Sequence, residues 1–165
     1  MSEVFKTLAA VDCSDHTETK GRFTYLSWTW AWSLVKSKYP DATFEKHIFR
    51  DNQDNPLPFM RDTKGFTYVA TTVVIDGVSH TEVYPVLNNK NEPMTHPDSF
   101  SVNTALQRSL VKTLAFHGLG LNIYAGEDLP VMDQEANIDN VTRIVKDFES
   151  TESVDAIDSK WKSNQ

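Results

Sequence analysis

The sequence predicts an α+β fold in which an antiparallel β-meander of three to five strands packs against one long helix. Apolar residues recur every three to four positions after Ser99, as they do on the buried side of a helix. Two β-rich runs, residues 66–75 and 78–86, flank an Asp-Gly pair typical of a tight hairpin turn. A tryptophan-rich segment ahead of these runs predicts an additional N-terminal helix.

Length and charge divide the chain into a core and a tail. The chain has 165 residues, enough for one domain with its own core, and a net charge of −7. Residues 131–165 hold eight acidic and four basic residues. We therefore predict a core domain over residues 1–130 and an acidic C-terminal tail with short helices over residues 131–165. One cysteine, no apolar run of membrane-spanning length and no signal-peptide pattern predict a soluble cytoplasmic protein.

The N-terminal region predicts two helices separated by a polar loop. Residues 4–10 form the first, residues 12–21 the loop, and residues 25–39 the second, with Ser27 as its N-cap. Pro40 ends this second helix, because a proline disfavours helical geometry in the residue before it.

Trp30 and Leu34 point away from the main apolar side of the second helix, which carries Trp28, Trp32, Val35 and Tyr39. A helix with two apolar sides is buried on both, and we predict that Trp30 and Leu34 contact another subunit. The alternative is that Trp30 stacks on the chain's own sheet.

The middle of the chain predicts the strands of the meander. Residues 43–50 alternate as a strand, residues 59–62 form a short one, and residues 66–75 are the clearest. Residues 78–86 return as its partner, and Pro85 marks a strand end or an edge. Polar loops are predicted at residues 51–58, after the first strand, and at residues 87–97, after the last.

The long helix begins after Asp98 or Ser99, either of which can cap it, and ends at Gly118. Its buried side is predicted to carry Val102, Ala105, Leu106, Leu110, Thr113, Leu114 and His117. Arg108 and Lys112 lie four residues apart and form a separate basic stripe. Like charges at this spacing cost a few tenths of a kcal/mol in an isolated helix, so the stripe favours an anionic ligand such as a polyphosphate. The alternative is an ordinary solvated surface over a core helix.

The sequence shows no convincing active site. It has neither a GxxxxGK[ST] nor a GxGxxG motif, and its five histidines are scattered, so no cofactor or metal is predicted. We expect His117 to cap carbonyls or fill the core, and Cys13 has no obvious base partner. Glu127 and Asp128 are expected to cap a turn, although with Asp62 they could serve a metal-dependent nuclease.

Two segments carry a family resemblance. YLSWTWAWSLVKSKYPDATFE and SFSVNTALQRSLVKTLAFHGLGLNIYAGEDLP resemble the N- and C-terminal signatures of phage Sak-type single-strand annealing proteins. With the strands between them, the resemblance covers about residues 20–130. This group is more distantly similar to the eukaryotic Rad-group strand-annealing mediator.

The resemblance implies oligomeric rings or helical arrays that hold single-stranded DNA in a basic groove with its bases exposed. It also implies ATP-independent strand annealing in phage recombination and repair, in the cytoplasm of the bacterial host. Arg108 falls on a family arginine, whereas Gln107 and Val111 replace residues that tend to be basic in the eukaryotic form. The predicted DNA-binding residues are Arg108, Lys112, Tyr25, Arg61, Lys64 and Lys90.

Two further predictions concern partners. The acidic tail could dock on a single-strand-binding protein, or compete with DNA for the groove. The chain could also be a protein-interaction module without DNA binding, whose tryptophan helix holds the partner.

Overall fold

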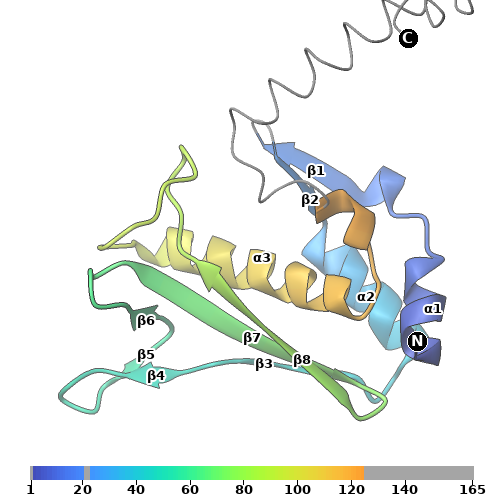
Figure 1. Cartoon of the computed structure of the whole chain (residues 1–165), viewed down its shortest axis with the longest axis horizontal. Coiled ribbons are helices and arrows are strands. Elements are labelled where there is room, and N and C mark those ends of the chain that lie inside the picture. Colours follow the sequence, from blue (N-terminus) through green and yellow to red (C-terminus); the bar gives the residue numbers. More distant parts are fainter. Residues whose placement is uncertain (1, 21–22, 125–165) are drawn as a thin grey trace, which may run out of the picture. The chain divides into compact units, whose positions relative to one another are not determined.

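The structure is a computed structural model that describes residues 2–20 and 23–124, and it confirms the predicted α+β fold (Figure 1). The main sheet has four antiparallel strands: β3 (Thr43–Lys46), β6 (Met60–Arg61), β7 (Thr67–Ile75) and β8 (Val78–Pro85). The long helix α3 (Ser99–Phe116) packs along this sheet. The predicted tail, residues 131–165, lies outside the described residues, as do Glu127 and Asp128.

The hairpin of β7 and β8 is the centre of the sheet. Its register runs from Tyr68 opposite Pro85 to Ile75 opposite Val78, so Pro85 ends β8 as predicted. The two turn residues have positive φ angles, 49° at Asp76 and 75° at Gly77, as a type I′ turn requires. The other side of β7 is shared by β3 and β6. β7 is therefore covered on both edges, which suits the most apolar strand of the chain.

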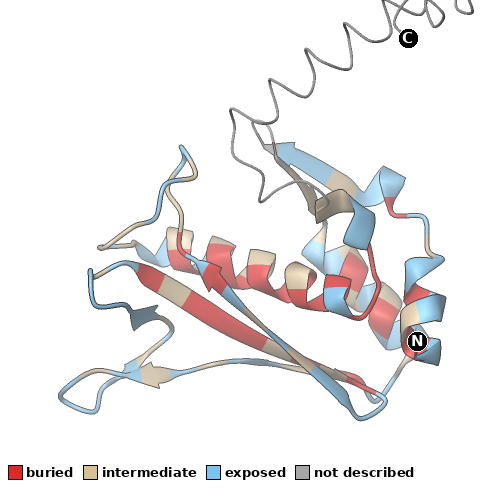
Figure 2. Cartoon of the chain, viewed as in Figure 1, coloured by how far each residue is buried: buried red, intermediate tan, exposed pale blue. Residues whose placement is uncertain are grey.

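The core lies between β7 and α3 and extends to buried residues of the N-terminal region (Figure 2). Alternate residues of β7 are fully buried, and every residue predicted for the buried side of α3 is buried, which confirms the predicted helix face. Asp98 caps the helix, since its carboxylate accepts the backbone N–H of Ser101. The Thr113 hydroxyl lies 3.2 Å from the carbonyl oxygen of Thr71 and 2.7 Å from that of Ser109, so it bonds α3 to the central strand.

His117 belongs to this core. It is 2% exposed, and its Nε2 lies 3.2 Å from the carbonyl oxygen of Val73 on β7. Burial lowers the pKa of His117, and the charge of His80 lowers it further, against the hydrogen bond to Val73. The imidazole therefore donates to the sheet as a neutral group, which agrees with the predicted core role.

The N-terminal region differs from the prediction. The helices α1 (Glu3–Ala9) and α2 (Trp28–Lys38) form, and Ser27 is the N-cap residue of α2, although its hydroxyl makes no capping bond to the backbone. The predicted polar loop over residues 12–21 is wrong. It contains the 3-10 turn η1 (Ser14–His16) and the strand β1 (Thr17–Lys20).

The predicted start of the second helix is also wrong at Tyr25. This residue lies on β2 (Phe23–Leu26), which pairs with β1 so that Glu18 faces Tyr25. The physical reason is that cross-strand hydrogen bonds satisfy the backbone of both segments, a pairing that a polar sequence such as TETK does not signal.

The predicted strand over residues 43–50 is broken in the middle. After β3, the chain forms β4 (Phe49–Arg50), which pairs with β5 (Pro56–Leu57) in a separate two-stranded sheet. After α3, the described residues end with the 3-10 turn η2 (Leu121–Tyr124). Among the described residues, none of the helices combines the length and apolar character needed to cross a membrane.

Gly118 joins the end of α3 to α1. Its φ is +107°, and a Cβ placed there would lie 2.6 Å from the carbonyl oxygen of Phe5 in α1. Gly77 also has a positive φ, but a Cβ there would meet nothing within 4 Å. Close contact with the backbone of α1 therefore requires glycine at residue 118.

We expect Gly118→Ala to lower the free energy of unfolding by about 2–4 kcal/mol, because it adds backbone overlap to an unfavourable φ. Gly77→Ala is the matched control and should cost only about 1–2 kcal/mol, from φ alone. Urea unfolding followed by circular dichroism measures both. Equal losses in the two variants would contradict the proposed contact between Gly118 and α1.

Candidate nucleic-acid interface

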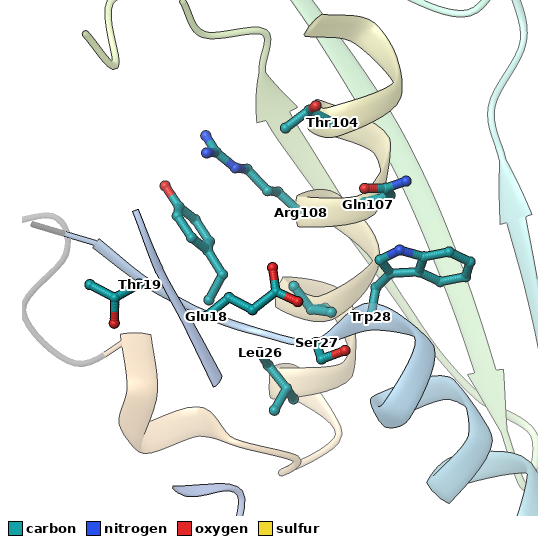
Figure 3. A pocket seen from close by; sticks show the side chains of 10 residues that line it. Glu18, Thr19, Leu26, Ser27, Trp28, Thr104, Gln107 and Arg108 are labelled. Carbon is teal, nitrogen blue, oxygen red and sulfur yellow. The ribbon is translucent and has the colours of Figure 1, made fainter. Parts of the chain in front are cut away.

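A pocket of about 350 Å³ lies between the β1–β2 hairpin, the start of α2 and one side of α3 (Figure 3). The hairpin supplies one wall and two turns of α3 supply the other. The lining residues are Glu18, Thr19, Tyr25, Leu26, Ser27, Trp28, Thr104, Gln107, Arg108 and Val111. The structure therefore brings two of the predicted DNA-binding residues, Tyr25 and Arg108, into one concave site.

Arg108 and Tyr25 are in direct contact. The Arg108 Cζ atom lies 4.1 Å from the centroid of the Tyr25 ring, which is the geometry of a cation–π contact. Among the described residues, no carboxylate forms an ion pair with Arg108. The tyrosine ring therefore orients the guanidinium without neutralising its charge.

Lys112 follows one helical turn later and also lies beside aromatic rings. Its Nζ atom is 5.3 Å from the centroid of Tyr84 and 5.7 Å from that of Tyr124. We call Arg108 and Lys112 the cationic stripe. Both cations are half-buried, and both are held on one side of α3 by tyrosines from different parts of the chain.

The three weaker candidates lie elsewhere. The Arg61 guanidinium donates to the carbonyl oxygen of Thr95 and lies 5.4 Å from the Phe59 ring, beside the segment that leads into α3. Lys64 and Lys90 are exposed residues of tight turns. Since Lys112 is thirteen residues beyond the start of α3, about 20 Å separates it from that end of the helix. The hydrogen bond and the ring contact of Arg61 involve neither Arg108 nor Lys112.

Trp30 finds a partner within its own chain. Its ring stacks on His16 of η1, with centroids 4.0 Å apart and an angle of 14° between the planes. Trp30 and Leu34 are half-buried and pack against the core. The ring that covers Trp30 thus comes from η1, a segment that the sequence analysis interpreted as a loop. A contact of Trp30 and Leu34 with another subunit stays a prediction.

Of the three carboxylates considered for a nuclease, only Asp62 lies among the described residues. Among them there is no group of three or more histidine, cysteine, aspartate and glutamate side chains that could hold a metal. The Asp62 carboxylate accepts the backbone N–H groups of Lys64 at 2.8 Å and Phe66 at 2.9 Å, so it shapes the turn before β7.

Three pocket residues were missed by sequence reasoning. The sequence predicts a loop at Glu18, marks Gln107 only as an uncharged replacement, and predicts a core side for Trp28, which is 39% exposed. The only available signal was the alternation of Thr17, Glu18, Thr19 and Lys20, which fits a strand as well as a loop.

A known protein family matches most of the chain. Residues 3–153 match the family model described as Sak Single Strand Annealing Protein. The chain belongs to the Sak family of single-strand annealing proteins. The Sak match extends beyond the predicted range of about 20–130 at both ends, so the prediction that residues 131–165 lie outside the resemblance is wrong for residues 131–153. No curated protein and no solved structure matches this Sak protein.

Cys13 of the Sak protein is not placed to act as a nucleophile. It is 5% exposed, and burial raises its pKa, as does the charge of Asp12. We expect Ellman's reagent at pH 8 to react with Cys13 at least about tenfold more slowly in the native protein than in urea. The absorbance at 412 nm follows the reaction, and rapid labelling of the folded protein would contradict the buried thiol.

Proposed function

We propose that this Sak protein binds single-stranded DNA along the cationic stripe and anneals complementary strands in homologous recombination without ATP. The observation that carries the proposal is the pair Arg108 and Lys112, which lie one turn apart on α3 and are each held beside a tyrosine ring. Membership of the Sak family supports it. Annealing needs a grip on phosphates that leaves base edges free, and arginine and lysine supply such a sequence-independent grip.

The aromatic contacts make the cations better ligands for phosphate. Immobilising a long side chain on binding costs about 0.5–1.5 kcal/mol, because the side chain loses conformational entropy. Arg108 already rests on Tyr25, so part of this loss occurs during folding rather than during binding. The cation keeps its charge, because the tyrosine ring is neutral.

Repetition of a weak site explains how an acidic protein can hold DNA. The net charge is −7, but the field at the groove decides binding and not the total charge. We infer an oligomeric ring or helical array in which each subunit contributes two or three phosphate contacts to one strand. Linked weak contacts of this kind raise the overall affinity by orders of magnitude.

Exposed apolar side chains support self-association. Ile48 is 61% exposed, Val83 is 56% exposed and Phe100 is 70% exposed. Such side chains favour contact with another protein surface where they form a contiguous patch. We add them to Trp30 and Leu34 as candidates for the contact between subunits.

We propose that three further cations and the acidic tail also take part. Arg61, Lys64 and Lys90 extend the path of the strand beyond the stripe, toward the next subunit. The acidic tail, residues 131–165, binds a single-strand-binding protein, and the site of action is the cytoplasm of the bacterial host.

We expect the double variant Arg108→Ala, Lys112→Ala to bind single-stranded DNA about 10–100-fold more weakly, because each subunit loses two phosphate contacts. The slope of log affinity against log salt should become shallower by about 1.4 per subunit bound. Fluorescence anisotropy with a labelled oligonucleotide measures both. The double variant Lys6→Ala, Lys38→Ala removes the same charge from exposed positions outside the pocket and should bind like the original protein.

The same variants should separate annealing from assembly. The stripe variant should anneal labelled complementary strands slowly while its oligomer, sized by light scattering, is unchanged. Annealing at the original rate would refute the groove assignment. Strands shortened in Mg²⁺ would indicate the nuclease instead, and a protein that ignores oligonucleotides at low salt would favour the interaction module.

Tyr25 gives a second test of the site. Tyr25→Leu removes the ring beneath Arg108 and should weaken DNA binding about two- to fivefold, the scale of an exposed cation–π contact. Tyr25→Phe keeps the ring and should bind nearly as well as the original protein. Equal losses in the two variants would mean that the hydroxyl, and not the ring, matters for binding.

A further inference from the structure

The pocket beside the cationic stripe contains a carboxylate, which a site for phosphate alone would avoid. Glu18 lines the same pocket as Arg108, yet the two form no ion pair in the part of the chain that the structure describes. Glu18 points into the space bounded by Trp28, Gln107 and Arg108 (Figure 3). A phosphate in this space would be repelled by Glu18, so the pocket is suited to a different part of the nucleotide.

The shape of the pocket suits a nucleobase. About 350 Å³ lies in the range of small-molecule sites and has room for one planar ring system. Trp28 supplies an aromatic wall that is 39% exposed, and Tyr25 supplies a second ring. Stacking on an aromatic side chain is a common way for proteins to hold an unpaired base.

The polar groups of the pocket select among the bases. An ionised carboxylate only accepts hydrogen bonds, whereas an amide and a guanidinium can donate them. Neither Glu18 nor Gln107 has a side-chain hydrogen bond to another described residue, so both can bind a ligand. The pocket lining therefore combines an acceptor from β1 with an amide and a guanidinium from α3.

Guanine matches this arrangement best. Its Watson–Crick edge carries two adjacent donors, N1–H and the N2 amino group, next to the O6 acceptor. Adenine and cytosine each place one amino donor beside a ring-nitrogen acceptor, and thymine has a single N–H between two carbonyl oxygens. We propose that the pocket holds one guanine per subunit, with N1–H and N2–H donated to Glu18 and with O6 accepting from Gln107.

This inference rests on the proposed function and adds to it a preferred alignment of the DNA strand on the protein, which is set by the guanines of the strand. A guanine held by its Watson–Crick edge is withheld from pairing while its neighbours stay exposed. The complement must then displace Glu18 to complete the duplex. The strand is gripped through phosphates at every subunit and positioned by one base at guanine-containing sequences.

The test compares oligonucleotides that differ by one exocyclic group. A labelled oligo(dT) with regularly spaced dG is compared by anisotropy with the same strand carrying deoxyinosine, which lacks the N2 amino group. We expect the original protein to bind the dG strand about tenfold more tightly, the scale of a hydrogen bond to a charged group. Glu18→Gln should remove most of this difference. Glu45→Gln, at an exposed position outside the pocket, should keep it.

Chemical probing gives an independent readout. Kethoxal reacts with N1 and N2 of unpaired guanine, so pocketed guanines should be protected by the original protein and reactive with Glu18→Gln. Equal affinity for the dG and deoxyinosine strands would overturn the inference. A Glu18→Gln variant that binds every strand more tightly by the same factor would also overturn it, since Glu18 would then act only as a repulsive charge. If the original protein binds none of the DNA strands, this result would instead overturn the proposed function.

Discussion

The contact between α3 and β7 determines where every other part of the site lies. β7 presents alternate buried residues to the helix, and the hydroxyl of Thr113 and the ring of His117 bond to carbonyl oxygens of the strand. These bonds fix the rotation of α3 about its axis, because a rotated helix would leave both polar groups buried without partners. The rotation in turn fixes the direction in which Arg108 and Lys112 project.

A second layer limits how much of α3 stays open. The β1–β2 hairpin, the start of α2 and η2 pack near the helix on the side away from the sheet, and they supply Tyr25 and Tyr124 to the cations. The cationic stripe lies between these two covered surfaces. Two half-buried cations one helical turn apart suit an extended polyanion, because a strand can follow the helix from one cation to the other.

The sequence predicts those elements whose signal is local. The four-residue recurrence of Val102, Leu106, Leu110 and Leu114 predicts α3 and its buried face, and the Asp-Gly pair predicts the central hairpin with its register. Each depends on residues close together in the chain. The strength of these two signals explains why the fold class is correct although several boundaries are not.

The site is harder to predict because its contacts join distant segments. Glu18 and Gln107 are far apart in the sequence. They line the same pocket only because the fold packs β1 near α3. The sequence of β1 has no apolar alternation that would predict its pairing with β2. Tyr25 on β2 fits a helical pattern as well as a strand. Arg108 and Lys112 were found because one helix carries both, whereas the carboxylate across the pocket belongs to another element.

A mixed site has a physical advantage for annealing. A groove of cations alone would hold a strand most tightly where charge density is highest, and the finished duplex has more phosphate than the single strand it replaces. Such a groove would retain its product. A carboxylate beside the stripe lowers the affinity for additional phosphate, and a hydrogen bond to an unpaired base is lost once that base enters a duplex. In the proposed binding mode, Glu18 would provide a difference in affinity between substrate and product that Arg108 and Lys112 alone would not supply.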